Sequence, residues 1–234
     1  MIKLSFLKRI YTKITGKYFE ISYAQTGEDI IINFLIDAKR IKNFSYLDIG
    51  ANHPSKFNNT YKFYEQGYKG VNIEPDPSIF KILNKARKRD INLNIGIAAY
   101  SNDEADFYIM KTPVLNTFSE VEAKNLVKKG ITSINKVVKI KLQTIASIID
   151  EYFKIDGPTF INLDVEGLDE EILRTFPFGK YRPYLFCIET VHYSNDASSD
   201  KRVEIIEIMK ENGYKIFADT YVNTLFIDTK SIFR

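Results

Sequence analysis

The chain is predicted to fold as one α/β domain around a mostly parallel seven-stranded sheet that ends in an antiparallel hairpin. Apolar strand-like runs alternate with helix-like segments over most of the 234 residues, which is the pattern of a parallel sheet covered by helices on both faces. Two early runs end on polar tips, since residues 45–49 lead into Gly50 and residues 70–73 lead into Glu74. A composition of 44% hydrophobic and 27% charged residues fits a single domain with a sizeable core.

The first half of the sheet is predicted from apolar runs separated by helix-start signals. Thr26 and Asp29 have the spacing of a capping box. Asp76 followed by Pro77 begins another helix, and the basic residues within 81–89 are expected on its solvated face. The elements expected here are helices at about 22–38, 57–66 and 77–89 and strands at 45–49, 70–74 and 91–97.

The second half adds an insertion and the end of the sheet. Residues 111–136 lack strand periodicity and contain Pro113, Asn116, Thr117 and Gly130, so we expect a mobile, substrate-facing insertion there. The other elements expected are helices at 144–153, 168–176 and 203–212, strands at 106–110, 137–142, 159–165 and 184–188, and a terminal hairpin of 214–218 with 223–227.

Residues 1–21 are predicted to form a basic amphipathic helix ahead of the domain at 22–234. Ile2, Phe6, Ile10 and Ile14 recur every four residues, and residues 1–20 carry five basic residues against one acidic residue. Such a helix could lie on an anionic membrane surface or dock on its own domain or a sister subunit. Peripheral membrane contact and a homo-oligomer are therefore both expectations left open.

Composition also limits where the protein works and what it binds. No stretch has the apolar length needed to cross a bilayer. The single cysteine, Cys187, lies in an apolar run and favours a reducing compartment, so we expect a cytoplasmic protein, at the inner membrane surface if the basic helix binds lipid. Basic residues are scattered among acidic ones, which argues against nucleic-acid binding.

The loop after the first strand and the acid after the second predict a nucleoside cofactor. Asp48 and Glu74 form the pair, because an acid at the tip of the second strand can accept both ribose hydroxyls. The loop 50–54 (GANHP) has one glycine and a proline, which suits a pyrophosphate poorly. S-adenosylmethionine is therefore favoured over NAD or FAD. Two buried strands that end in solvated carboxylates remain the non-functional alternative.

Taken together, these motifs resemble the FkbM family of S-adenosylmethionine-dependent methyltransferases. The resemblance covers about residues 22–228, and the first twenty residues do not match. Asp169 departs from the family, which usually has a glutamate there. The matching pieces are SYAQTGED at 22–29, LDIGAN at 47–52, NTY at 59–61 with FYE at 63–65, GVNIEPDP at 70–77, TIASII at 144–149 and NLDVEGLD at 162–169.

The resemblance implies a Rossmann-like class I methyltransferase domain that transfers a methyl group to an oxygen, typically a hydroxyl of a sugar or small metabolite. It assigns the loop to methionine and ribose, the second strand tip to ribose and the third strand end to adenine. The residues expected to bind cofactor are Gln25, Asp48, Gly50, Ala51, Asn52, Glu74, Pro75, Gly96, Ile97 and Asp164.

A hydroxyl acceptor needs a base or a metal that lowers its pKa. Asp164 lies at the end of one predicted strand, and Glu189 and His192 follow the next. These three residues could hold Mg²⁺, which prefers oxygen ligands, or Asp164 could instead face the methionine ammonium. The expected catalytic residues are His192, His53, Asp164 and Glu189. Either histidine could be the general base, and the alternative role of His53, beside the cofactor loop, is to shape the turn before Pro54.

The predicted function is O-methylation of a sugar hydroxyl, on a nucleotide- or lipid-linked sugar of bacterial surface polysaccharide biosynthesis. The sequence leaves two alternatives: an N- or protein methyltransferase, and a catalytically silent module that binds S-adenosylmethionine or a nucleotide.

Overall fold

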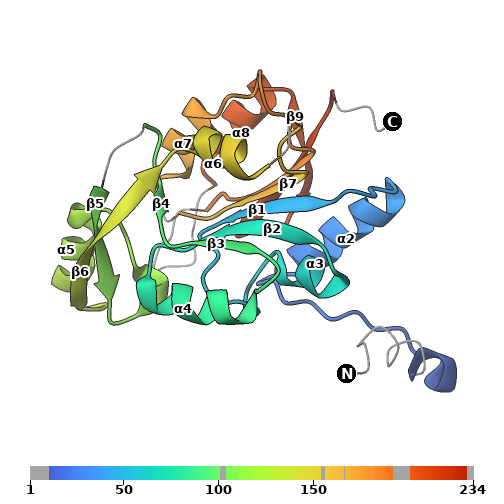
Figure 1. The fold of residues 1–234 in the computed structure, drawn as a ribbon, viewed down its shortest axis with the longest axis horizontal. Coiled ribbons are helices and arrows are strands. Elements are labelled where there is room, and N and C mark those ends of the chain that lie inside the picture. The colour runs from blue at the N-terminus through green and yellow to red at the C-terminus, as the bar shows by residue number, and fades with distance from the viewer. Residues whose placement is uncertain (1–10, 101–103, 154–155, 166, 192–200, 231–234) are drawn as a thin grey trace.

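The computed structural model describes residues 11–100, 104–153, 156–165, 167–191 and 201–230. Its centre is a seven-stranded sheet of order β3-β2-β1-β7-β8-β10-β9 (Figure 1). The first five strands in this order run parallel to one another, and β10 runs antiparallel to both β8 and β9. The predicted fold class is confirmed. The strands are β1 (Ser45–Ile49), β2 (Lys69–Ile73), β3 (Ile91–Leu93), β7 (Phe160–Leu163), β8 (Leu185–Glu189), β9 (Tyr214–Asp219) and β10 (Asn223–Asp228).

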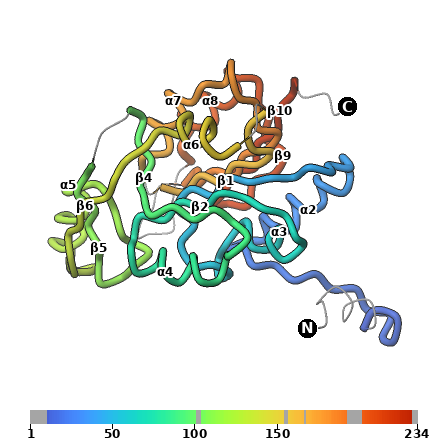
Figure 2. Tube along the Cα trace, viewed as in Figure 1, coloured from blue at the N-terminus to red at the C-terminus, as the bar shows by residue number. Residues whose placement is uncertain are grey.

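Helices cover both faces of this sheet, as the traces in Figures 1 and 2 show. One layer contains α2 (Glu28–Ala38), α3 (Tyr61–Gln66) and α4 (Pro77–Ala86), and the other contains α6 (Ile145–Tyr152), α7 (Asp169–Thr175) and α8 (Val203–Glu211). Because the chain passes through a helix between successive parallel strands, the carboxyl ends of β1, β2, β7 and β8 meet at one edge of the sheet.

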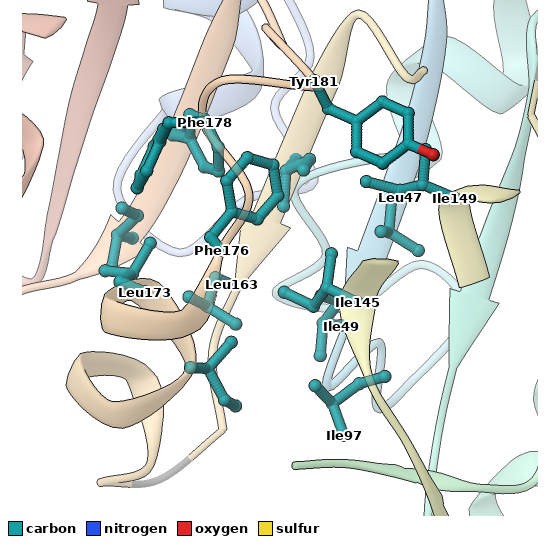
Figure 3. Packing of buried hydrophobic residues seen from close by; sticks show 14 of the residues in the cluster. Leu47, Ile49, Ile97, Ile145, Ile149, Leu163, Leu173, Phe176, Phe178 and Tyr181 are labelled. Atoms are coloured by element: carbon teal, nitrogen blue, oxygen red, sulfur yellow. The ribbon is translucent and has the colours of Figure 1, made fainter. Parts of the chain in front are cut away.

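The larger core lies between the sheet and α6, α7 and α8. Leu47 and Ile49 of β1 pack there with Leu163 of β7 and with Ile145 and Ile149 of α6 (Figure 3). Full burial of each such aliphatic side chain stabilises the fold by about 1.5–3 kcal/mol. Successive side chains of a strand point to opposite faces, so the residues between these aliphatic positions face α2 and α3.

A second, three-stranded sheet of order β4-β6-β5 corrects the predicted third strand. That strand, expected over 91–97, is split into β3 and a short β4 (Gly96–Ile97), and β4 pairs with the end of β6 (Ile134–Gln143) instead of with β2. The insertion expected at 111–136 contains a 3-10 turn (Pro113–Leu115), α5 (Glu120–Lys128) and the start of β6, which pairs with β5 (Glu104–Met110). That it faces the substrate stays a prediction.

The two predicted helix starts have different outcomes. Asp76 caps α4, and its Oδ1 accepts from the amides of Ser78 (2.7 Å) and Ile79 (3.3 Å). The capping box predicted at Thr26 and Asp29 is wrong. The helix begins at Glu28 with Gly27 as N-cap, and the carboxylate of Asp29 accepts from the hydroxyl of Ser22 and the amide of Tyr23.

Only part of the predicted N-terminal helix falls in the described residues. Residues 11–15 are helical, and residues 1–10 lie outside the described chain. The apolar side chains of Ile14 and Tyr18 are exposed. The segment joins the domain where Lys62 of α3 binds the carboxylate of Glu20 (3.0 Å) and the carbonyl of Ile21 (2.9 Å). None of the helices in the described ranges has the length and apolarity to span a membrane.

Candidate active site

The loop after β1 requires glycine at its first position for two reasons. Gly50 has a φ of +79°, and a Cβ built on it would lie 1.9 Å from the carbonyl oxygen of Asp164. The amides of Gly50 and Ala51 both donate to the carbonyl of Ile73, at 3.1 and 3.0 Å, and the amide of Asp164 donates to Ile49 (3.1 Å). The tips of β1, β2 and β7 are thereby held in direct backbone contact.

Glu74 is buried at the tip of β2, where the sequence predicts the ribose acid. Its two carboxylate oxygens accept from the amides of Asn52 and Asp76, each at 2.8 Å. Burial raises the pKa of Glu74 to about 7, against these two amide bonds that lower it. The side-chain amide of Asn94 donates to the carbonyls of Glu74 (2.8 Å) and Pro75 (2.9 Å), which fixes this tip from the other side.

Asp164 and Glu189 leave neighbouring strands at matching positions. Leu163 pairs with Ile188 in the register of β7 and β8, so the next residues along the two strands are these two acids. Burial, and then repulsion from Glu189, raise the pKa of Asp164 well above its usual range. A carboxyl group buried beside a second acid is stabilised by a proton or by a cation placed next to it.

The histidine candidates have separate outcomes. Nδ1 of His53 accepts from the amides of Ser55 (3.2 Å) and Lys56 (2.9 Å), which holds the turn around Pro54. A role of His53 as base stays a prediction. His192, predicted as base and metal ligand, lies outside the described residues. Gln25 is exposed beside α2.

Asp48 belongs to a buried row of polar residues that crosses four strands. In the strand register Asp48 pairs with Asn72 and with Asn162, which pairs with Cys187, and none of the four is more than 5% exposed. The carboxylate of Asp48 accepts from the hydroxyl of Thr60 (2.6 Å) and the amide of Asn162 (2.9 Å). Its side chain therefore faces α3. There it bonds side chains that support the loop after β1.

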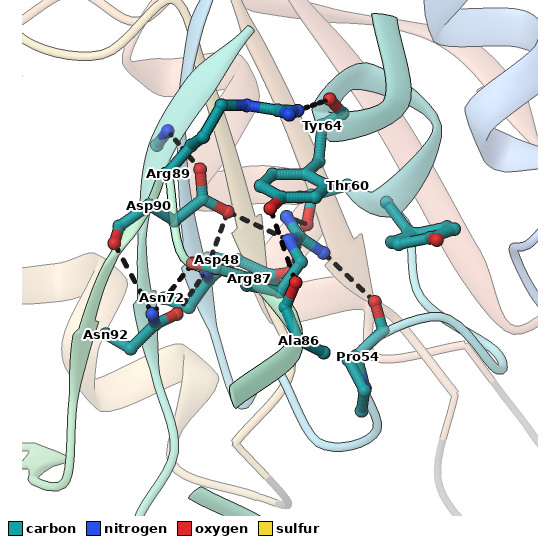
Figure 4. Close-up of polar contacts among 12 residues, drawn as sticks. Asp48, Pro54, Thr60, Tyr64, Asn72, Ala86, Arg87, Arg89, Asp90 and Asn92 are labelled. Carbon is teal, nitrogen blue, oxygen red and sulfur yellow. Dashed lines mark hydrogen bonds and ion pairs between the residues drawn. The ribbon is translucent and has the colours of Figure 1, made fainter. Parts of the chain in front are cut away.

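Arg87 is a structural residue that the sequence interpretation missed. The solvated face expected within 81–89 is wrong at this position, because Arg87 is 0% exposed. Figure 4 shows its guanidinium between Asp90 and the loop, with Nε bonded to Asp90 (2.8 Å) and Nη1 to the carbonyl of Pro54 (3.1 Å). The rings of Tyr46 and Tyr64 flank it. One arginine among the basic residues within 81–89 gives no sequence signal that it is buried.

The β4 residues predicted beside adenine have their own packing reasons. A Cβ on Gly96 would lie 2.5 Å from the ring of Phe118 and 2.7 Å from Leu142, and Ile97 is part of the larger core. The insertion also reaches the tip of β2, since the side chain of Asn116 donates to Asp76 (3.0 Å). The insertion and the elements at the tip of β2 are thus in contact.

The N-terminal motif is tied to the C-terminal hairpin by Glu28. This buried carboxylate accepts from the hydroxyl of Thr220 (2.6 Å) and the amide of Asn223 (2.9 Å). Asn223 pairs with Glu189 across β10 and β8. These bonds lower the pKa of Glu28 against the opposing effect of burial, which is the largest single influence.

A metal site is a separate question from the cofactor site. Within the part of the chain that the structure describes, no group of three or more His, Cys, Asp and Glu side chains could hold a metal ion. Because His192 lies outside that part, a magnesium ion held by Asp164, Glu189 and His192 stays a prediction of the sequence.

The residues present fit S-adenosylmethionine. A buried acid at the tip of β2 can accept the ribose hydroxyls, and the glycine at position 50 lets a ligand approach the backbone. The acids Asp164 and Glu189 repel each other, and a ligand with a positively charged ammonium and sulfonium would relieve that repulsion. Glu74 is the residue that would hold its ribose.

Comparisons with known proteins agree with this site. A family model described as Methyltransferase FkbM domain matches residues 48–216. No curated relative matches the sequence.

Solved structures of several methyltransferases resemble the fold at low identity. A TehB-like SAM-dependent methyltransferase from Corynebacterium glutamicum has 10% identity and a TM-score of 0.43 over 96% of this chain and 97% of that chain. The N-terminal domain of human METTL16, in complex with SAH, has 9% identity and a TM-score of 0.44 over 97% and 81%. The fibrillarin pre-rRNA processing protein of Methanococcus jannaschii has 16% identity and a TM-score of 0.43 over 82% and 69%.

At these TM-scores the assignment rests on the family match, which spans more than half of the chain and includes the tips of β1, β2, β7 and β8. The chain belongs to the FkbM family of methyltransferases and is an S-adenosylmethionine-dependent methyltransferase.

Proposed function

We propose that the protein methylates a hydroxyl group of a sugar, carried on a nucleotide or a lipid, in the biosynthesis of a bacterial surface polysaccharide. The observation that carries the proposal is the pair of acids at neighbouring strand tips, Asp164 and Glu189. A sugar hydroxyl is a weak acid, so its methylation needs a group that accepts its proton.

Asp164 is the base in this proposal. Its pKa is raised by burial and by repulsion from Glu189, and a base with a raised pKa takes a proton from a weak acid near neutral pH more readily. S-adenosylmethionine supplies the activated methyl group when bound, and the chain has to align the acceptor oxygen with it. Glu189 assists by keeping the proton affinity of Asp164 high.

The test is methylation of a panel of nucleotide sugars and lipid-linked sugars with isotopically labelled S-adenosylmethionine. Mass spectrometry of the products identifies an O-methyl sugar. Asp164→Asn should lower kcat by about 100-fold or more, the usual contribution of a general base. Activity of the wild type should rise with pH as Asp164 loses its proton.

Asp37→Asn is the matched control. Asp37 is exposed on α2 and bonds the side chain of Asn33 at 3.2 Å, so kcat should not change. An N-methylated product or a methylated protein would replace the proposal with the first alternative. Binding of S-adenosylmethionine without turnover of any acceptor would favour the silent module.

Contact with an anionic membrane is part of the proposal for a lipid-linked acceptor. The exposed side chains of Lys13 and Lys17 lie close in sequence to those of Ile14 and Tyr18, which are 77% and 78% exposed, and basic residues beside exposed apolar ones suit such a surface. Sedimentation with phosphatidylserine vesicles, but not with phosphatidylcholine vesicles, would support it. Failure of a Lys13→Glu, Lys17→Glu variant to lose binding would contradict it.

A further inference from the structure

Asn58 is a buried side chain that joins the cofactor loop to the start of α3. It is 2% exposed, and its Nδ2 donates to the carbonyls of Ala51 (2.9 Å) and His53 (3.3 Å). Its Oδ1 accepts from the amides of Tyr61 (2.7 Å) and Thr60 (3.0 Å). One side chain thus bonds backbone groups on both sides of residues 54–57.

The carbonyl of Ala51 and the amide of Asn52 belong to one peptide group, which is held from both ends. Asn58 binds its oxygen, and the Oε2 of Glu74 binds its N–H at 2.8 Å. Asn52 has a φ of +49°, a left-handed conformation that costs a residue other than glycine energy unless neighbours enforce it. The orientation of this peptide therefore sets where the carboxylate of Glu74 points.

Arg87 holds Asn58 in this position from the opposite side. Its Nη1 donates to the Oδ1 of Asn58 (3.3 Å) and to the carbonyl of Pro54 (3.1 Å), and Asp90 neutralises its charge. A charged donor on the Oδ1 also fixes which end of the Asn58 amide faces the loop. The Nδ2 is left with only acceptors around it.

We infer that Asn58 is a positioning residue for S-adenosylmethionine, which acts by fixing the Ala51–Asn52 peptide and, through it, the carboxylate of Glu74. The inference shares with the proposed function only the ligand S-adenosylmethionine, and it does not depend on which acceptor is methylated. Asn58 does not touch the cofactor in this scheme.

Two variants separate this role from simple folding. Asn58→Asp has the same shape and keeps the acceptor for Thr60, Tyr61 and Arg87. It turns an oxygen toward the carbonyls of Ala51 and His53 and toward the carboxylate of Asp48, all of which accept from Nδ2 in the wild type. Asn58→Ser keeps a hydroxyl that can cap the α3 amides and is too short to reach Ala51, without adding a charge. Each should weaken the binding of S-adenosylmethionine by about tenfold or more, because the free protein then has to restore the orientation of the Ala51–Asn52 peptide when the cofactor binds.

Arg89→Gln is the matched control. Arg89 lies two residues from Arg87, stacks on the Tyr64 ring at 4.0 Å and donates to the Tyr64 carbonyl, but bonds no loop residue. Figure 4 shows its side chain directed at Tyr64, away from Pro54. Its variant should bind S-adenosylmethionine like the wild type.

Calorimetric titration with S-adenosylmethionine reads affinity and stoichiometry at once. A positioning role weakens affinity at unchanged stoichiometry, whereas a misfolded fraction lowers stoichiometry at unchanged affinity. Affinity within twofold of wild type in both Asn58 variants would overturn the inference, as would a wild type that does not bind the cofactor. Failure to find a methylated sugar would count against the proposed function and leave the result on Asn58 intact.

Discussion

Replacement of Glu74 by glutamine should change how the stability of the protein depends on pH. Burial raises the pKa of Glu74 from 4.5 to about 7, so the folded protein holds this proton more tightly than the unfolded chain. The contribution of this group to the free energy of unfolding is therefore fully present below pH 4.5. It decreases as the pH rises toward about 7 and is lost above that pH.

The size of the effect follows from the shift. Each pKa unit corresponds to about 1.4 kcal/mol, so ionised Glu74 lowers the free energy of unfolding by about 3 kcal/mol at pH 8 relative to its protonated form. Glutamine cannot ionise. It also turns an amide group toward the N–H of Asn52 or Asp76 and loses one bond, which lowers stability at every pH by about 1–3 kcal/mol.

Urea unfolding at pH 5 and pH 8 isolates the ionisation. The free energy of unfolding of Glu74→Gln should rise by about 2.5 kcal/mol relative to that of the wild type between pH 5 and pH 8, because the carboxyl of the unfolded chain is already partly ionised at pH 5. The raised pKa of Asp48 is common to both proteins. The charge of Glu74 is one of the smaller causes of the raised pKa of Asp164, so its removal in the variant shifts the comparison further in the same direction. Glu204→Gln, at an exposed position of α8, should show no such change. Equal differences for Glu74→Gln at the two pH values would refute the reasoning.

Three further outcomes test the packing of the site. Gly50→Ala should lower the free energy of unfolding by about 3 kcal/mol or more and weaken the binding of S-adenosylmethionine, since its Cβ would overlap the Asp164 carbonyl. Unchanged values in chemical denaturation and calorimetric titration would contradict this. Gly96→Ala should cost about 1–3 kcal/mol in denaturation, and Phe118→Leu should recover part of that loss. Burial raises the pKa of the Cys187 thiol well above its usual range, so a thiol reagent at pH 8 should label it only after unfolding.

Strand alternation and helix-start signals were sufficient to predict most of the sheet. The runs at 45–49 and 70–74 differ from β1 and β2 by at most one residue at either end, because a buried parallel strand bounded by glycine and acids has few other interpretations. Asp76 and Pro77 likewise mark the start of α4. These signals are local and need no tertiary contact.

The errors lie where tertiary contacts decide. The strand expected over 91–97 breaks because its second half pairs with β6, a partner about fifty residues away. Thr26 does not cap α2 because its hydroxyl donates to Glu28, whose carboxylate is fixed by Thr220 and Asn223. No window of sequence around residue 26 contains that information.

The buried polar row could have been found from the sequence. Asp48, Asn72, Asn162 and Cys187 each stand among apolar residues near the end of a predicted strand, and strands in parallel register bring such positions side by side. Its connection to the loop could not, because it depends on Asn58 and Arg87, which come from segments outside these four strands.

The most direct test of the cofactor site is calorimetric titration of S-adenosylmethionine into the wild type and Glu74→Ala. The account predicts binding of one molecule per chain and an affinity at least tenfold weaker in the variant, because a carboxylate that accepts ribose hydroxyls contributes about 1.5–3 kcal/mol. Equal affinity in the two proteins, or no binding by the wild type, would contradict the claim that the tips of β1 and β2 hold the cofactor.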